Sequence, residues 1–155
     1  MDWRALMLVR RSDTTNTQGK DYDRFAYSDA GALTQFGAFV EVLQPGATSS
    51  DRHWHTDQDE FLYLLTGEAI LQENDGEHLM RPGDAACWKA GEPNGHRLVN
   101  RSDAPCSFVV VGTRTPRDTV HYSDIDMMVK IDASGDDFTR KDGSPLTAEQ
   151  IGEET

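Results

Sequence analysis

The chain has 155 residues, of which 37% are hydrophobic and 27% charged, and this length and composition suit a single globular domain. Its formal net charge of -12 disfavours nucleic-acid partners, which require clustered Lys and Arg, and disfavours anionic membrane surfaces. No apolar run approaches the roughly 18 residues of a membrane-spanning helix, and the N-terminus lacks a cleavable signal, so we expect a soluble cytoplasmic protein.

The first 35 residues hold one short apolar run, residues 5–9, followed by a polar stretch at 11–24 whose composition indicates a loop. We expect an edge strand and an arm that wraps the core. Residues 36–43 (FGAFVEVL) are rich in β-forming residues and end at Pro45-Gly46, which predicts a strand followed by a turn.

The next stretch, RHWHTDQDEFLYLLTG, places two histidines one residue apart and a glutamate five residues later. Successive side chains of a strand point to opposite faces, so His53 and His55 share one face and can bind one metal ion. Glu60 follows a short polar link and could bring an oxygen ligand beside the two nitrogens. Asp57 and Asp59 are rivals in that link, and a fourth ligand must come from elsewhere.

Residues 60–65 (EFLYLL) are apolar on both faces except for Glu60. A strand buried on both sides implies a second layer or a subunit partner, and together with the run at 5–9 it predicts a homodimer. The two cysteines, Cys87 and Cys106, each lie in an apolar run. We expect buried thiols there rather than a disulfide framework.

Strands are predicted at residues 69–72, 77–80, 85–88, 96–100 and 107–112, separated by turn signals about every ten residues. This spacing predicts an all-β closed antiparallel barrel or sandwich. Beyond Pro116 the chain becomes acidic, with a strand predicted at 129–131 and the start of a helix at 147–150. We therefore expect an N-terminal arm (1–35), a barrel (36–116) and a C-terminal arm (117–155) that is partly disordered toward its end.

Two sets of residues resemble the signature motifs of the cupin superfamily. The first is Pro45-Gly46, His53, His55, Glu60 and Gly67, and the second is Gly83-Asp84, Gly91, His96 and Asn100. The resemblance implies a double-stranded β-helix, a jelly-roll-like barrel, with His53, His55, Glu60 and His96 as metal ligands inside one end. Two extra residues separate Gly91 from His96 and lengthen the loop at 92–95, which forms either a lip that selects the ligand or a surface bulge without that role.

Three imidazole nitrogens and one carboxylate oxygen suit one divalent transition metal ion, with Fe, Mn, Ni, Co and Zn all open. The remaining histidines, His78 in a polar hairpin and His121 in the arm, are interpreted as surface residues. Positions left for water or substrate make such a site catalytic in form.

The predicted function is a small metalloenzyme that acts on a small organic molecule, as a dioxygenase-like or an isomerase-like enzyme. An isomerase needs a side-chain base in the cavity, and the sequence names no base beyond the ligands. The alternative is a binding or sensing module without turnover, because one fold hosts many functions.

Overall fold

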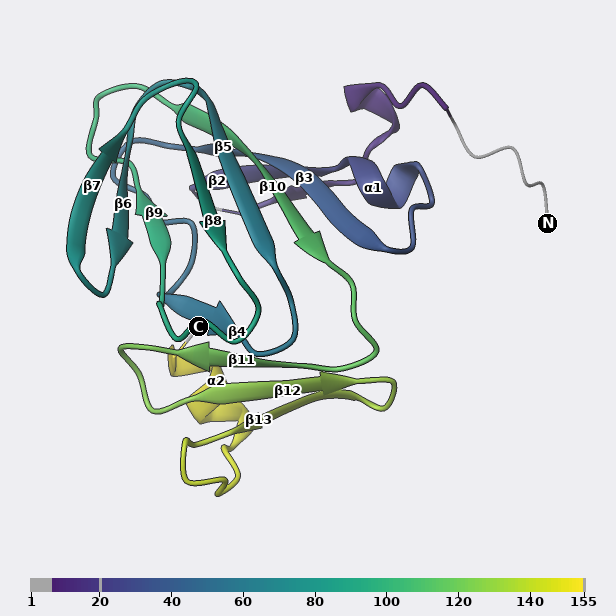
Figure 1. Cartoon of the computed structure of the whole chain (residues 1–155), viewed down its shortest axis with the longest axis vertical. Helices are drawn as coiled ribbons and strands as arrows, with labels where there is room; N and C mark the ends of the chain where they lie inside the picture. Colours follow the sequence, from purple (N-terminus) through teal and green to yellow (C-terminus); the bar gives the residue numbers. More distant parts are fainter. Residues whose placement is uncertain (1–6, 20, 155) are drawn as a thin grey trace.

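The computed structural model describes residues 7–19 and 21–154, and antiparallel strands are the main regular elements among them (Figure 1). One sheet has six strands, in the order β1 (Asn16–Gln18), β2 (Tyr22–Ala26), β3 (Phe36–Leu43), β10 (Cys106–Thr113), β5 (Glu60–Thr66) and β8 (Ala85–Trp88). A three-stranded sheet contains β7 (Gly76–Met80), β6 (Ala69–Glu73) and β9 (Arg97–Val99). A four-stranded sheet contains β13 (Gly135–Thr139), β12 (Met128–Asp132), β11 (Asp118–Tyr122) and β4 (His53–His55).

The hydrophobic core joins the six-stranded and three-stranded sheets. Leu43, Leu64 and Phe108 from the first meet Ala69 and Leu98 from the second, and all five are almost fully buried. The six-stranded sheet ends at β1 and β8 rather than closing on itself. The expectation of a closed barrel is therefore wrong, and the sandwich alternative describes the arrangement.

The predicted strands of the central region are confirmed, with β3 and β8 matching residues 36–43 and 85–88. The loop predicted at 11–24 is wrong, because it holds a 3-10 helix (Arg11–Asp13), β1 and the start of β2. Strand β1 is polar and exposed, so pairing with β2 forms it rather than burial. Of the apolar run at 5–9, residues 5 and 6 lie outside the described residues and 7–9 form no strand.

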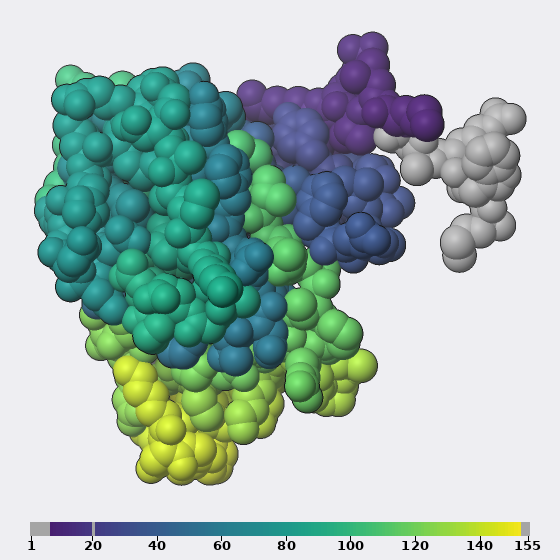
Figure 2. Space-filling view, in the orientation of Figure 1, coloured from purple at the N-terminus to yellow at the C-terminus, as the bar shows by residue number. Residues whose placement is uncertain are grey.

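The C-terminal strands form a layer against the rest of the molecule (Figure 2). Strand β11 pairs with β4, so this segment lies directly beside the strand that carries the two histidines. Strands β11 and β13 were not predicted. Helix α2 (Ala148–Glu154) begins as predicted: the Thr147 hydroxyl accepts a hydrogen bond from the Gln150 amide at 3.2 Å, and the Gln150 side chain accepts one from the Thr147 amide at 3.0 Å. Another short helix, α1 (Tyr27–Ala30), links β2 to β3.

Strand β5 is buried on one face only. Leu62 and Leu64 point into the core, whereas Phe61, Tyr63 and Leu65 are each about 40% exposed. Within a single chain, the outer face of β5 is therefore uncovered, contrary to the expectation of a strand buried on both faces. Cys87 faces the same outer side, where it is paired with Phe61 and exposed, contrary to prediction. Both cysteines are free thiols.

Glycines of the predicted motifs permit the sharp turns between strands. Gly46, Gly67, Gly83 and Gly91 all have positive φ. Gly67 is the most constrained, because a Cβ there would lie 2.8 Å from the Pro105 carbonyl oxygen. No helix among the described residues is long and apolar enough to cross a membrane.

Candidate functional site

Two predicted ligands, His53 and His96, are held side by side by their backbones. The His53 amide donates to the His96 carbonyl at 3.3 Å, and the His96 amide donates to the His53 carbonyl at 3.1 Å. The alternation of β4 turns His53 and His55 into one cavity, while the Trp54 ring stacks on His121 at 4.0 Å. His121 therefore lies away from the cluster.

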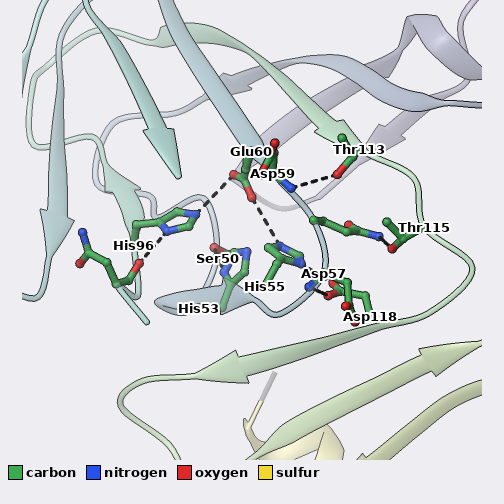
Figure 3. Close-up of polar contacts among 12 residues, drawn as sticks. Ser50, His53, His55, Asp57, Asp59, Glu60, His96, Thr113, Thr115 and Asp118 are labelled. Atoms are coloured by element: carbon green, nitrogen blue, oxygen red, sulfur yellow. Dashed lines mark hydrogen bonds and ion pairs between the residues drawn. The ribbon is translucent and has the colours of Figure 1, made fainter. Parts of the chain in front are cut away.

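Glu60, the first residue of β5, points toward the imidazoles (Figure 3). Nε2 of His55 lies 3.4 Å from one carboxylate oxygen, and Nε2 of His96 lies 3.5 Å from the other. Ligand atoms of His53, Glu60 and His96 all lie within 4.8 Å of one another. His55 stands outside that mutual group but approaches the same carboxylate, so the structure gathers the three predicted histidines around Glu60.

Hydrogen bonds on the outer side of each imidazole select its tautomer. Nδ1 of His53 lies 2.8 Å from the Asp51 carbonyl oxygen, and Nδ1 of His96 lies 3.0 Å from that of Asn94. Nδ1 of His55 lies 2.6 Å from the Asp118 carboxylate. Because these oxygens only accept, Nδ1 carries the hydrogen, and Nε2 of each neutral ring presents a lone pair toward Glu60.

These lone pairs test whether the cluster fits a metal ion. Nε2 of His96 is buried and has no hydrogen-bond partner. Nitrogen lone pairs set against carboxylate oxygens repel each other unless a proton or a cation lies between them. Three imidazoles and a carboxylate form a donor set that divalent transition metals prefer. The residues present therefore fit such an ion.

The pKa shifts favour the ligand forms of two residues. Burial lowers the pKa of His53, which keeps its imidazole neutral. Burial would raise the pKa of Glu60, but in the metal-free protein its interactions with the His55 and His96 imidazoles, once a ring is protonated, lower it well below the ordinary value. For His55, burial lowers the pKa, yet the Glu60 and Asp118 carboxylates together raise it. Glu60 is thus an anion at neutral pH.

A cavity of about 340 Å³ extends from this cluster between the sheets. Trp88 lines it and stacks on His96 with ring centroids 3.6 Å apart, which fixes the imidazole plane. Its lining residues also include three arginines, Arg24, Arg97 and Arg114. A small organic molecule is of the size that such a cavity accepts.

Several residues weighed in the sequence lie outside the cavity. Asp59 accepts a hydrogen bond from the Ala90 amide at 2.8 Å, and Lys89 is exposed. The loop at 92–95 does not line the cavity, because Asn94 bonds instead to Glu73 at 2.9 Å and to the β6–β7 turn. Of the two alternatives for this loop, the ligand-selecting lip is therefore wrong, and the loop's visible contribution is the Asn94 carbonyl that orients His96.

Some residues of the site were not predicted from the sequence. Glu41 and Arg24 line the cavity, and Asp118 orients His55. The signal for Glu41 was available, because a charged residue stands on the same strand face as Phe39 and Leu43. Asp118 gave no signal, since it lies in the segment interpreted as an arm.

Comparison with known proteins identifies relatives of this arrangement. The family model of the Cupin domain matches residues 39–112. A crystal structure from Silicibacter pomeroyi, described as a sugar phosphate isomerase from a cupin superfamily, is 52% identical, with a TM-score of 0.81 over 90% of this chain and 94% of that one.

Two further proteins from Streptomyces are more distantly similar. The structure of the polyketide cyclase RemF from Streptomyces resistomycificus is 21% identical, with a TM-score of 0.63 over 76% of this chain and 85% of that one, and this likeness shows the fold alone. The tetracenomycin polyketide synthase protein TcmJ from Streptomyces glaucescens is 29% identical over 98 residues, which are 63% of each protein.

Proposed function

The chain belongs to the cupin superfamily, and from this premise we propose that it is a metal-dependent isomerase of a small anionic, sugar-like molecule. The observation that carries the proposal is the cavity, in which the histidine–glutamate cluster and three arginines surround one space of about 340 Å³. The 52% identical relative described as a sugar phosphate isomerase supports the substrate class.

In this proposal one divalent transition metal ion is held by His53, His55, Glu60 and His96. Asp118 and the backbone carbonyls behind the rings keep each Nε2 turned inward. When bound, the ion supplies Lewis-acid polarisation of a substrate oxygen. The protein residues bind the anionic end, orient the molecule and move protons.

Arg24 is the arginine that faces the cavity beside Glu41. It stands opposite Glu41 in the strand register and donates to it through Nε and one terminal nitrogen. Arg97, in contrast, lies on the opposite strand face from His96, and its Nε donates to the Gln72 side chain at 2.6 Å. The second terminal nitrogen of Arg24 makes no hydrogen bond among residues 7–19 and 21–154, so the guanidinium can also bind a phosphate or carboxylate.

The test uses metal-free protein reloaded separately with Fe, Mn, Ni, Co or Zn. Interconversion of phosphorylated aldoses and ketoses, followed by NMR, should occur with at least one ion and stop on chelation. Arg24→Gln should raise KM for a phosphorylated sugar by about tenfold or more and change it little for the unphosphorylated analogue. Ligand binding without turnover across the panel would instead favour the binding module, and oxygen uptake would favour an oxygenase.

We also propose that the protein forms a homodimer through the outer face of β5. Phe61, Tyr63 and Leu65 lie exposed on one row of that strand. A contiguous apolar row of this kind is covered in many oligomers. Light scattering at micromolar concentration should give twice the chain mass, and Phe61→Glu with Leu65→Glu should give the monomer. A monomeric parent protein would refute the proposal.

A further inference from the structure

A second glutamate, Glu41, lies in the wall of the same cavity. It stands in β3 opposite Phe108 of β10, and its side chain is only 1% exposed. Strand alternation places it on the inward face with Phe39 and Leu43. Among the described residues that line the cavity, Glu41 and Glu60 are the only carboxylates.

The two oxygens of Glu41 have different surroundings. One accepts hydrogen bonds from Nε and a terminal nitrogen of Arg24, at 3.0 and 2.9 Å. The other oxygen, Oε1, is buried and has no hydrogen-bond partner. Buried polar atoms are nearly always paired, so an unpaired carboxylate oxygen in a ligand-sized cavity indicates a group kept for a substrate.

Arg24 fixes the Glu41 carboxylate from one side. The guanidinium lies over the Phe39 ring at 4.5 Å, and the Arg24 side chain is 40% exposed, so the pair spans from solvent to the cavity. Cys106 is a further titratable group near Glu41, and its own pKa is raised to about 11. Cys106 is a neutral thiol at physiological pH and cannot replace the carboxylate as a base.

We propose that Glu41 is the catalytic base and acid that transfers the proton during isomerisation, an inference that rests on the proposed function. Oε1 takes the proton from the substrate carbon next to the carbonyl. The electrons of the broken C–H bond form the carbon–carbon double bond of an enediolate, and the carbonyl π electrons move to its oxygen. Glu41 then returns the proton to the former carbonyl carbon while the hydroxyl proton passes between the two oxygens, which regenerates the carboxylate without a co-reactant.

The electrostatics of the site agree with this role. Burial raises the pKa of Glu41, and the charge and hydrogen bonds of Arg24 offset only part of the rise. A base whose pKa approaches the working pH accepts and returns a proton most efficiently. Glu60, in contrast, is committed to the imidazoles and its pKa is lowered.

The first test compares the parent protein with Glu41→Gln, which keeps the shape and an oxygen acceptor for Arg24. In D₂O the parent should interconvert the sugars and exchange the transferred hydrogen with solvent. The variant should bind metal and substrate as before but lose about 10²–10⁴-fold in kcat and lose the exchange. Glu77→Gln is the matched control, since Glu77 is also paired with an arginine, Arg101, but lies exposed outside the cavity.

A second variant separates catalysis from folding. Arg24→Gln removes the cation that lowers the pKa of Glu41, so the acid limb of kcat/KM should move to higher pH, an effect that a structural ion pair would not produce. Sugar interconversion that persists in Glu41→Gln overturns the assignment and leaves the isomerase proposal intact. A parent protein that neither interconverts the sugars nor exchanges their protons overturns both.

Discussion

The two glutamates of the cavity have the same side chain and different environments. Glu60 lies among three imidazoles that stabilise its anion and lower its pKa, whereas Glu41 is buried beside a single half-exposed arginine and its pKa is raised. Opposite shifts of two carboxylates in one site allow one to stay ionised while the other carries a proton. Environment, rather than residue type, divides the two roles.

The parts of the cavity around Glu60 and Glu41, here the Glu60 end and the Glu41 end, also differ in their hydrogen bonds. At the Glu60 end, hydrogen bonds to Asp51, Asn94 and Asp118 satisfy the outer nitrogen of every imidazole. Each end leaves one buried atom without a partner, Nε2 of His96 and Oε1 of Glu41. The unpaired nitrogen stands in a set of donors whose outer atoms are all held, which suits a fixed metal site, whereas the unpaired oxygen stands alone and suits a group that takes a partner during a reaction.

The largest effect is expected from removing an imidazole at the Glu60 end. His55→Ala or His96→Ala should reduce bound metal from about one ion per chain to nearly none, because each removes a donor that the backbone holds in place. Elemental analysis of purified protein measures this. His121→Ala is the control, since His121 stacks on Trp54 and belongs to no cluster of described residues that could hold an ion. Unchanged metal content in both ligand variants would refute the assignment of these histidines as metal ligands. The contrast drawn between Glu60 and Glu41 would then fail as well.

A smaller effect is expected from Asp118, which does not belong to the ligand set but hydrogen-bonds to His55. Asp118→Asn weakens the hold on Nδ1 of His55, and replacing such an outer partner typically reduces metal affinity by about 10–100-fold. Competition with a chelator measures the dissociation constant. Asp126→Asn, which alters the exposed partner of Arg140, is the control. Equal affinities in parent and Asp118→Asn would show that the outer hydrogen bond does not tune the site.

The sequence predicted the Glu60 end better than the Glu41 end for a physical reason. His53, His55 and Glu60 are close in sequence, and strand alternation alone turns the two histidines to one face. Glu41 lies between apolar residues in a strand whose neighbours in the sheet, β2 and β10, are far apart in the sequence. Its partner Arg24 lies in a segment that looked like a loop, so only the sheet register reveals the pair.

The same argument explains the errors in the predicted fold. Strands β3 and β8 carry apolar patterns that mark them locally, but β1, β11 and β13 are largely polar and depend on pairing. The single exposed face of β5 could not be separated from a buried one, because both would be apolar. Non-local hydrogen bonding decides such elements, and a periodicity argument does not include it.

Stability against pH should differ in sign between the two glutamates, and Glu60 should show the larger change. Its folded pKa is lowered, so ionised Glu60 stabilises the fold above its unfolded pKa, and this contribution is lost as pH falls through the folded pKa. In metal-free protein at neutral pH, Glu60→Gln should lower the free energy of unfolding on the order of 2 kcal/mol, the value of a charge-assisted hydrogen bond. Chemical denaturation measures it, and an unchanged midpoint would contradict the ionic role.

Glu41→Gln should have the smaller and opposite effect. Because the folded pKa of Glu41 is raised, the folded state holds its proton more tightly than the unfolded chain, and the carboxylate progressively destabilises the fold as pH rises from about 4.5. The amide removes that effect, and the 40% exposed Arg24 can be solvated by water. The variant should therefore match the parent below pH 4 and exceed it at neutral pH by about 2–4 °C in Tm, the shift that roughly 1 kcal/mol gives in a domain of this size. A variant less stable than the parent at neutral pH would make Glu41 a structural partner of Arg24 rather than a group retained for function.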